Sequence, residues 1–395
     1  MLRAAYLFER FPSFGQTFCY REVSELIGQG AEVSIYSIRR PSGEPSQDWN
    51  EEIVRRVVYL PDETELLAEI TRCTREETLP AAALQAIQEW GRQTDFLRLA
   101  QAAYLGPRLR ALGIELVHAH FAGMAARTAY WIHEFFGIDY SLTAHANDIF
   151  APRDFVVSLP MLLRGAVAIV TESDFSVEYL RSHFPTEADK VHRVYNGVDL
   201  SRFPPAEFAS DPPRIISVGR LITKKGFRTL IAACARLRRS GQRFRCEIIG
   251  EGPLFGELMA QVAADQLEGE VRLLGPLSQS QIAGRLAAAT VFALPCTRDA
   301  DGGMDNLPTV IMEAMASGLP VISTPLAGIP EMVEPGLTGA LVPADDPAAL
   351  AEAIGKLLGQ PEEARRLGAR GRERAAEKFS IATNVRALAG ILGRR

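Results

Sequence analysis

Two cations closely follow one strand-like apolar run in the second half of the chain. The run Arg214–Val218 leads into Gly219 and Arg220, and Lys225 follows five positions after Arg220. Glycine lets the backbone approach a ligand closely, and a guanidinium and an ammonium at the end of a strand suit the oxygens of a diphosphate. An ordinary charged surface loop would have the same residues, so these residues by themselves leave both interpretations open.

A glycine-rich segment and a short helix between residues 299 and 320 form a second candidate phosphate site. Pro308 suits the first turn of a helix, and Gly318 follows its end. The unpaired amides at the start of such a helix suit phosphate oxygens. Glu313 lies among apolar residues of this helix, where its carboxylate needs partners: ribose hydroxyls would serve, and so would a structural arginine. The residues that lead into the helix are Gly302, Gly303, Met304, Asp305, Asn306 and Leu307.

Two further turns border the same end of the predicted sheet. Gly250 and Gly252 follow an apolar run, either to admit a ligand or only to make a tight turn. Ser278 and Gln281 have the spacing of a helix capping box. The backbone of Leu277, just before that box, is a candidate contact for the edge of a nucleobase.

The first half contains imidazole and carboxylate groups next to strand-like runs. These residues are His118, His120, His145 and Asp148. One mononuclear metal site is conceivable from such ligands, whereas a core or sugar-binding role for each histidine is the simpler interpretation. The loop after the first predicted strand contains Phe14, Gly15 and Gln16, either as a turn or as a surface that a substrate approaches.

Apolar runs of strand length alternate with helical patterns along almost the whole chain, which predicts βαβ units and parallel sheets. Residues 61–112 have a helical pattern only, and the proline-rich stretch 203–213 is the predicted linker between two blocks. The predicted strands are Ala4–Phe8, Glu32–Ser37, Ile114–His118, Tyr140–Ala144, Ala166–Thr171 and Val191–Tyr195, then Arg214–Val218, Arg245–Ile249, Val271–Leu274, Val291–Leu294, Val321–Ser323 and Ala340–Val342.

We therefore expect two doubly wound α/β domains that face a central cleft, because 395 residues exceed the usual size of one core. The predicted domains are 1–205 and 206–375, and a final helix in 376–395 is expected to pack back on the first domain. Ligands of open α/β sheets bind beyond the carboxyl ends of the strands. The candidate residues lie at those ends.

Composition argues against several classes of protein. The five cysteines are scattered, which excludes a disulfide scaffold or a zinc module as the organising principle. The 43 basic and 48 acidic residues form no basic stripe, so no nucleic-acid partner is expected. No apolar run approaches the roughly 18 residues of a membrane span. We expect a cytoplasmic protein, with peripheral association at the cytoplasmic membrane face allowed.

Together these motifs resemble the retaining glycosyltransferases of the GT-B fold, group 4, which use a nucleotide-sugar donor. The resemblance covers nearly the whole chain, and two N-terminal segments are similar to the exopolysaccharide and colanic acid enzymes of that family. The motifs that carry it are Val218–Arg220 with Lys225 and Gly226, Gly250–Pro253, Asp305 with Glu313–Val321, Gly328–Glu331 and Gly336–Gly339, and in the first half Phe11–Phe18 and Thr143–Phe150.

The resemblance implies roles for individual residues. Arg220 and Lys225 would hold the diphosphate and stabilise the departing charge, and Glu313 would bind the ribose. Asp305 and His145 would contact the transferred sugar, which makes Arg220, Lys225, Asp305 and His145 the expected catalytic residues. The expected donor contacts are completed by Gly15, Gly250, Gly252, Leu277, Gly302, Gly303, Met304, Asn306 and Leu307, and the expected acceptor side by Phe14, Gln16, His118, His120 and Asp148.

The resemblance implies a UDP-sugar as donor, a glycan, lipid-linked saccharide or small molecule as acceptor, and neither metal nor cofactor. Asp305 and Gln16 stand where glutamate is usual in the family, and Cys296 where serine is common. The aspartate is one methylene shorter, which affects the choice of donor. A nucleotide-sugar 2-epimerase of the same fold is the alternative activity. A non-catalytic partner subunit is a third interpretation. The intact set of Arg220, Lys225 and Glu313 argues against that third interpretation.

Overall fold

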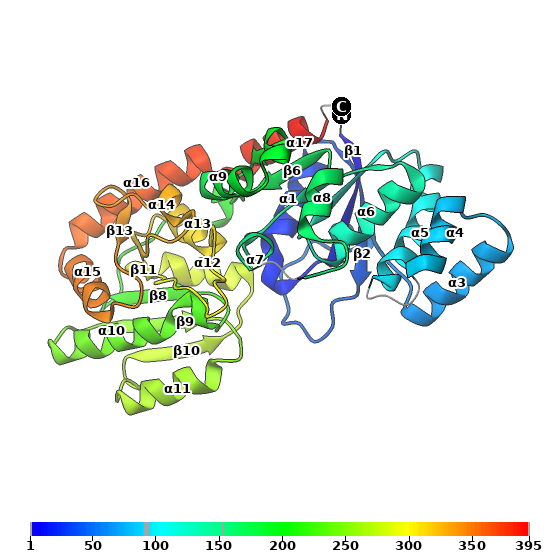
Figure 1. Cartoon of the computed structure of the whole chain (residues 1–395). Coiled ribbons are helices and arrows are strands. Elements are labelled where there is room, and N and C mark those ends of the chain that lie inside the picture. Colours follow the sequence, from blue (N-terminus) through cyan, green and yellow to red (C-terminus); the bar gives the residue numbers. More distant parts are fainter. Residues whose placement is uncertain (1, 91–94, 152–153, 394–395) are drawn as a thin grey trace.

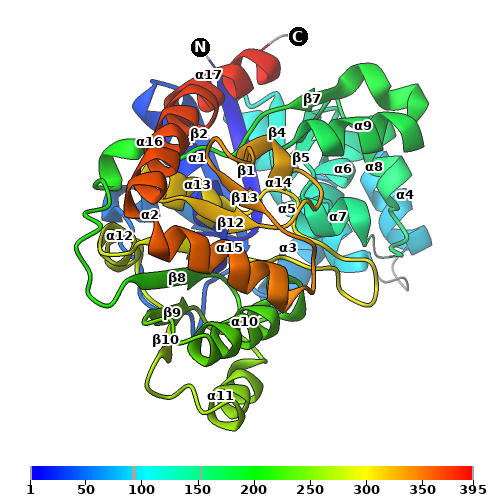
Figure 2. The same cartoon turned by 90° about the vertical axis from the view of Figure 1, so that its left-hand side faces the viewer.

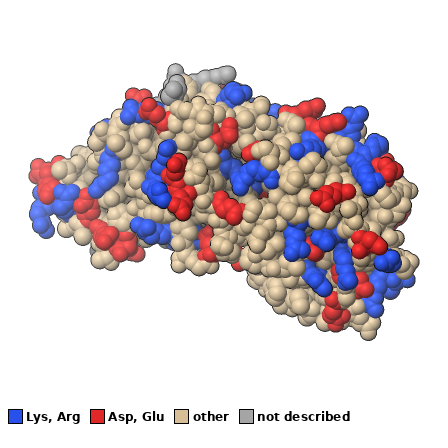
Figure 3. Space-filling view, turned by 180° about the vertical axis from the view of Figure 1, so that it is seen from behind, with Lys and Arg blue, Asp and Glu red and all other residues tan. Residues whose placement is uncertain are grey.

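The computed structural model describes residues 2–90, 95–151 and 154–393. Two parallel sheets lie side by side, each with helices packed on its faces (Figure 1). This is the GT-B arrangement of two Rossmann-like domains. On the face shown in Figure 3, basic and acidic side chains are interspersed. Within the described residues, no helix is long and apolar enough to cross a membrane.

The N-terminal sheet has seven strands in the order β3-β2-β1-β4-β5-β6-β7, and every pairing is parallel. Alternate residues of the first strand enter different cores: Ala5 and Leu7 pack on one face and Tyr6 and Phe8 on the other. The strands are β1 (Arg3–Arg10), β2 (Glu32–Arg39), β3 (Val57–Tyr59), β4 (Leu116–His120), β5 (Asp139–Thr143), β6 (Ala168–Thr171) and β7 (Val191–Arg193).

Helices cover both faces of this sheet (Figures 1 and 2). The predicted helical region 61–112 forms three helices, α3 to α5, and its residues 91–94 lie outside the described part of the chain. The helices of this domain are α1 (Thr17–Gly28), α2 (Glu51–Arg55), α3 (Glu63–Arg75), α4 (Ala81–Trp90), α5 (Phe96–Ala111), α6 (Met124–Phe136), α7 (Ala146–Phe150), α8 (Leu159–Gly165) and α9 (Asp174–His183).

Two strand predictions in this domain were wrong in ways that have clear causes. Strand β3 was not predicted, because it has three residues and follows the charged pair Arg55 and Arg56. Strand β4 begins and ends two residues later than predicted. His118 and His120 therefore lie within the strand, where all side chains are buried, and not in the loop after it.

The C-terminal sheet has six strands in the order β10-β9-β8-β11-β12-β13, again all parallel. Each predicted strand of this half corresponds to an observed one. The strands are β8 (Arg214–Val218), β9 (Arg245–Ile249), β10 (Val271–Gly275), β11 (Val291–Ala293), β12 (Val321–Ser323) and β13 (Gly339–Leu341). The helices are α10 (Phe227–Arg239), α11 (Phe255–Ala264), α12 (Gln279–Ala287), α13 (Thr309–Ala316), α14 (Ile329–Met332), α15 (Pro347–Gly359) and α16 (Pro361–Lys378).

The final helix, α17 (Ile381–Leu392), packs against α1 of the N-terminal domain (Figure 1). Val385, Leu388 and Leu392 of this helix enter the core beneath α1. Residues 394–395 of the predicted helical segment lie outside the described residues. The C-terminal core also includes Tyr195 and Phe203, so it starts before the predicted boundary at 205.

Candidate active site

Glycines hold the cation-bearing loop at the end of β8. The amide of Gly219 donates to the carbonyl of Ile249, 2.9 Å away, and the amide of Leu221 donates to the carbonyl of Glu251, 2.8 Å away. Gly250 has a φ of 146°, and a Cβ there would lie 1.9 Å from the Gly219 carbonyl oxygen. A side chain at Gly250 would therefore push away the loop that carries Arg220. Gly250 thus has a structural role here, as does Gly252, whose Cβ would meet the backbone of Leu221.

A compact charge cluster lies beside this loop. Lys225 Nζ is 2.6 Å and Lys224 Nζ is 3.5 Å from the carboxylate of Asp305. Burial favours the neutral form of both partners, but the charge of Asp305 outweighs it and raises the pKa of Lys225. In the same way, the two lysines hold the pKa of Asp305 below its usual value despite burial. Lys225 and Asp305 are therefore both ionised at neutral pH.

Lys224 also connects the two domains. Its Nζ donates to Asn147 Oδ1 on α7, 2.8 Å away. In the sequence, only its position next to Lys225 pointed to Lys224. The sequence does not show which of the two lysines contacts the other domain. A cavity of about 290 Å³ opens beside it, lined from the C-terminal domain by Arg220, Lys224, Asp299 and Asp301 and from the N-terminal domain by Asn147 and Ala151. Arg220 therefore borders open space between the domains.

The segment before α13 is held against the N-terminal domain. Asn306 Oδ1 accepts a hydrogen bond from Ser173 Oγ at 2.7 Å, and Asn306 Nδ2 lies 3.5 Å from Glu172 Oε1. Met304 and Leu307 are buried, and Gly302 has a φ of 86°. The segment thus places Asp305 between the lysines of one domain and the polar groups of the other.

The Gly328–Glu331 motif is a further contact between the domains. Glu331 accepts hydrogen bonds from the backbone amides of Asp174 and Phe175, both at 2.9 Å, at the start of α9. A Cβ at Gly328 would lie 2.8 Å from Ser173 Cβ. Gly328 thus permits the close approach, and Glu331 stabilises the amides of the first turn of α9.

Glu313 has the arginine partner that the sequence left as one of two alternatives. Arg21 Nη2, from α1 of the N-terminal domain, donates to Glu313 Oε1. The two side chains are only 6% and 4% exposed. The sequence analysis did not identify Arg21, although an arginine on the buried face of an amphipathic helix requires a partner.

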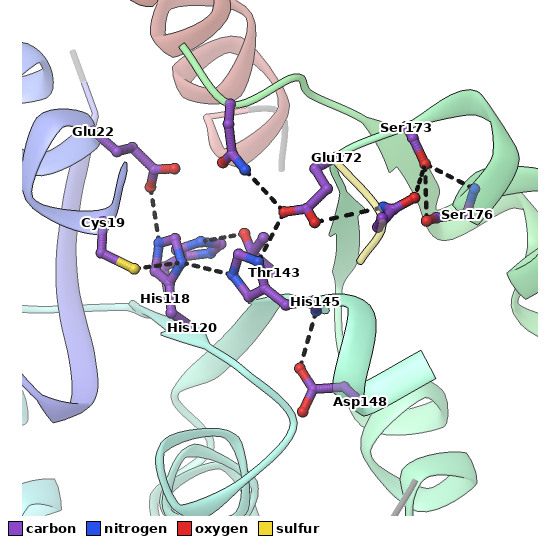
Figure 4. A network of polar contacts seen from close by, with 12 residues as sticks. Cys19, Glu22, His118, His120, Thr143, His145, Asp148, Glu172, Ser173 and Ser176 are labelled. Atoms are coloured by element: carbon purple, nitrogen blue, oxygen red, sulfur yellow. Dashed lines mark hydrogen bonds and ion pairs between the residues drawn. The ribbon is translucent and has the colours of Figure 1, made fainter. Parts of the chain in front are cut away.

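A chain of polar groups runs through the N-terminal domain towards the cleft (Figure 4). His120 Nε2 lies 3.0 Å from Glu22 Oε1, and His120 Nδ1 lies 3.3 Å from His145 Nε2. His145 Nδ1 in turn lies 2.9 Å from Glu172 Oε2. Glu172, which the sequence analysis missed, therefore joins His145 to Asn306, the neighbour of Asp305.

Two residues assigned to the acceptor side have partners within the N-terminal domain. His118 is fully buried, its ring 4.8 Å from that of Tyr6, and its nitrogens lie 2.8 Å from Ser141 Oγ and 3.0 Å from Thr143 Oγ1. Burial lowers the pKa of His118 to about 3, so this histidine is neutral. Asp148 accepts from the backbone amide of His145 and caps α7. His118 thus has the core role given as the simpler interpretation, and an acceptor contact for either residue stays a prediction.

The loop Phe14–Gln16 follows β1 and leads into α1. The amide of Phe14 donates to Glu44 Oε2 at 2.6 Å, which fixes the start of the turn. Gly15 is exposed, and a Cβ there would meet no atom within 4 Å. Leu277 lies between β10 and α12, where it packs on the C-terminal core.

The metal site that the sequence made conceivable would need Asp148, whose carboxylate caps α7 in this structure. Within the described part of the chain, Glu22, His118 and His120 do place possible ligand atoms within 4.8 Å of one another. The nitrogens of His118 face the hydroxyls of Ser141 and Thr143, and a metal ion would have to displace those contacts. Metal independence stays a prediction.

Replacing Glu22 by glutamine should destabilise the N-terminal domain in a pH-dependent way. Burial favours the neutral form of Glu22, but His120 outweighs it and lowers the pKa of Glu22. A carboxylate with a lowered pKa stabilises the fold above its unfolded-state pKa, and this contribution disappears as the pH falls through the folded-state pKa. We expect Glu22→Gln to lower the free energy of unfolding by about 1–3 kcal/mol at pH 7. The difference should shrink at pH 4, which urea denaturation at the two pH values measures.

Comparisons with known proteins agree with this geometry. Residues 15–202 match the model "Glycosyltransferase Family 4" and residues 201–374 match "Glycosyl transferases group 1". The chain is 30% identical over 99% of both chains to WcaL of Escherichia coli, assigned to colanic acid biosynthesis as a glycosyltransferase, and 29% identical over 88% of both to the amylovoran biosynthesis glycosyltransferase AmsK of Erwinia amylovora.

Solved structures share the fold. Anabaena HepE, in complex with UDP and glucose, superposes with a TM-score of 0.75 over 100% of both chains at 18% identity. Sucrose-phosphate synthase of Thermosynechococcus elongatus gives a TM-score of 0.74 at 20% identity, over 99% of this chain and 98% of that one. With a family 4 N-terminal domain, a group 1 C-terminal domain and relatives along its full length, this chain belongs to the GT-B glycosyltransferases of family 4.

Proposed function

We propose that this protein transfers a hexose-type sugar from a UDP-sugar to a hydroxyl group of a glycan or a lipid-linked saccharide, with retention of the anomeric configuration. One observation supports this most: Glu172 links His145 of one domain to the segment that carries Asp305 in the other. Groups from both domains thus converge next to the lysines at the end of β8. This is the place where a sugar diphosphate would lie in an open α/β sheet.

The relatives support the choice of substrates. WcaL and AmsK are named for the biosynthesis of polysaccharides, and the HepE structures contain UDP or UDP-glucose. A polysaccharide built on a lipid carrier would bring its acceptor to the cytoplasmic face of the membrane. We therefore extend the proposal to a cytoplasmic enzyme that works at that face.

The chain's own residues supply the chemistry that the transfer needs. The bond between the anomeric carbon and the diphosphate oxygen breaks as the acceptor oxygen forms its bond from the same face. The acceptor proton passes to the departing diphosphate, so no enzyme nucleophile is required. Arg220 and Lys225 would stabilise the charge that develops on the diphosphate. His145, fixed by Glu172, and Asp305 would contact the sugar.

Turnover is expected to be unchanged in excess EDTA, because Arg220 and Lys225 provide the positive charge that a divalent cation provides in other transferases. Release of nucleoside diphosphate from a panel of UDP-, GDP- and ADP-sugars, with simple glycosides as acceptors, measures this. A loss of turnover that magnesium or manganese restores would contradict metal independence. Epimerised donor without consumption of acceptor would instead support the 2-epimerase.

A further inference from the structure

Arg21 and Glu313 form a buried ion pair between the two domains. Arg21 belongs to α1 and Glu313 to α13, and the positions are 292 residues apart in sequence. Both side chains are more than nine-tenths buried. Taking two charges out of water is costly, so the pair is weak evidence of a contribution to stability alone.

The guanidinium of Arg21 is only partly satisfied. Nη2 contacts Glu313, whereas Nη1 is buried and has no hydrogen-bond partner among the described residues. An unpaired N–H on a buried charged group is unfavourable, because water that solvated it in the unfolded chain is not replaced. The free N–H therefore marks a position where an acceptor atom from outside the chain would be stabilised.

Two other buried arginines of the same domain differ on this point, because Arg98 Nε also lacks a partner whereas Arg127 has no such atom. Arg127 donates to Asp95 Oδ1 and, through Nε, to the carbonyl of Gly123. No nitrogen of Arg127 is among the buried atoms without a partner. Its guanidinium also lies over the ring of Phe155, at 3.7 Å. Arg127 is thus completed within its own domain, whereas Arg21 is not.

We propose that Arg21 is a donor-binding residue, and that its Nη1 donates to a ribose hydroxyl oxygen of the nucleotide. The proposal rests on the proposed function and on the ribose contact that the family resemblance implies for Glu313. A hydroxyl group both donates and accepts hydrogen bonds. A ribose hydroxyl can therefore donate its O–H to the Glu313 carboxylate while its oxygen accepts from Arg21 Nη1. The ion pair is thus a matched acceptor and donor for a diol. The nucleotide would then be held by both domains, and its binding would favour their closed arrangement.

The test compares ribose with dideoxyribose in the same site. Calorimetry on the full chain gives the Kd of whichever of UDP, GDP or ADP binds the wild type most tightly, and the Kd of its 2′,3′-dideoxy analogue. The Kd of the dideoxy analogue divided by the Kd of the ribonucleotide measures the contribution of the hydroxyls to binding. We expect Arg21→Met and Arg21→Lys to reduce this ratio by about tenfold, since one charge-assisted hydrogen bond corresponds to at least that factor.

The lysine variant separates binding from a purely structural role. Lysine keeps the charge beside Glu313 but has one nitrogen, which cannot reach both the carboxylate and a hydroxyl in the geometry of a guanidinium. If Arg21 only neutralised Glu313, Arg21→Lys would keep the wild-type ratio, and that result would overturn the proposal. The matched control Arg127→Lys alters an equally buried pair and should leave the ratio unchanged. Failure of all three nucleotides to bind the wild type would overturn the proposed function itself, and the Arg21 proposal with it.

Discussion

Replacing Lys225 by methionine is expected to reduce turnover by about 100- to 1000-fold, the usual effect of removing one donor that stabilises charge in a transition state. Lys225 Nζ lies 2.6 Å from Asp305 in a site where both side chains are 14% exposed. Methionine fills a similar volume and removes the charge together with its N–H donors. The loss should appear in kcat, because the charge on the diphosphate grows as the sugar leaves.

The control for this prediction is Lys356→Met, on α15 in the same domain and outside the site. Its kinetic constants should be those of the wild type. Thermal unfolding of both variants checks that the fold is intact. If folded Lys225→Met kept more than about a third of wild-type kcat, Lys225 would not stabilise the leaving group and the assignment from the β8 loop would be wrong.

Asp305→Asn should lower turnover by about 100-fold and leave the affinity for nucleoside diphosphate nearly intact. A group that contacts the transferred sugar acts on the transition state and not on the nucleotide, so kcat falls and the nucleotide Kd does not. The amide also removes the charge that raises the pKa of Lys225. Steady-state kinetics and nucleotide calorimetry on one protein preparation separate the two effects.

Two further variants define the role of Asp305. Asp305→Glu restores the residue that is usual in the family and should change the preference between donors by about 1–3 kcal/mol, because one methylene is noticed in a tight pocket. Asp345→Asn is the control, since this carboxylate accepts from Thr297 and lies outside the lysine cluster. A fall in nucleotide affinity with unchanged kcat in Asp305→Asn would place this residue at the nucleotide and contradict the prediction.

The sequence predicted most of the fold because its signals are local. Buried parallel strands are short apolar runs, and glycines and prolines mark their ends. The exceptions have physical causes as well. Strand β3 has only three residues, and β4 extends to His120, whose polarity favoured a predicted run that begins and ends two residues too early. A histidine that is satisfied by neighbouring hydroxyls is compatible with a core strand.

The residues that complete the site were harder to predict, because their partners are distant in sequence. Arg21 contacts Glu313 of the other domain, and Lys224 contacts Asn147 of the other domain. Glu172 contacts His145, which precedes it by 27 residues. No local pattern encodes such a contact. For the same reason the sequence did not show that Gly250 packs against the loop that carries Arg220, and its contact with the donor stays a prediction.

The central claim is that sugar is transferred from a nucleotide donor with retention, and proton NMR of the product tests it most directly. Wild-type protein is incubated with an α-linked UDP-sugar and a simple glycoside acceptor, and the coupling of the new anomeric proton is followed as the product forms. The account predicts an α-linked glycoside that contains the donor's sugar. A β-linked product would contradict the retaining mechanism, and an epimerised UDP-sugar with the acceptor unchanged would contradict the transferase assignment.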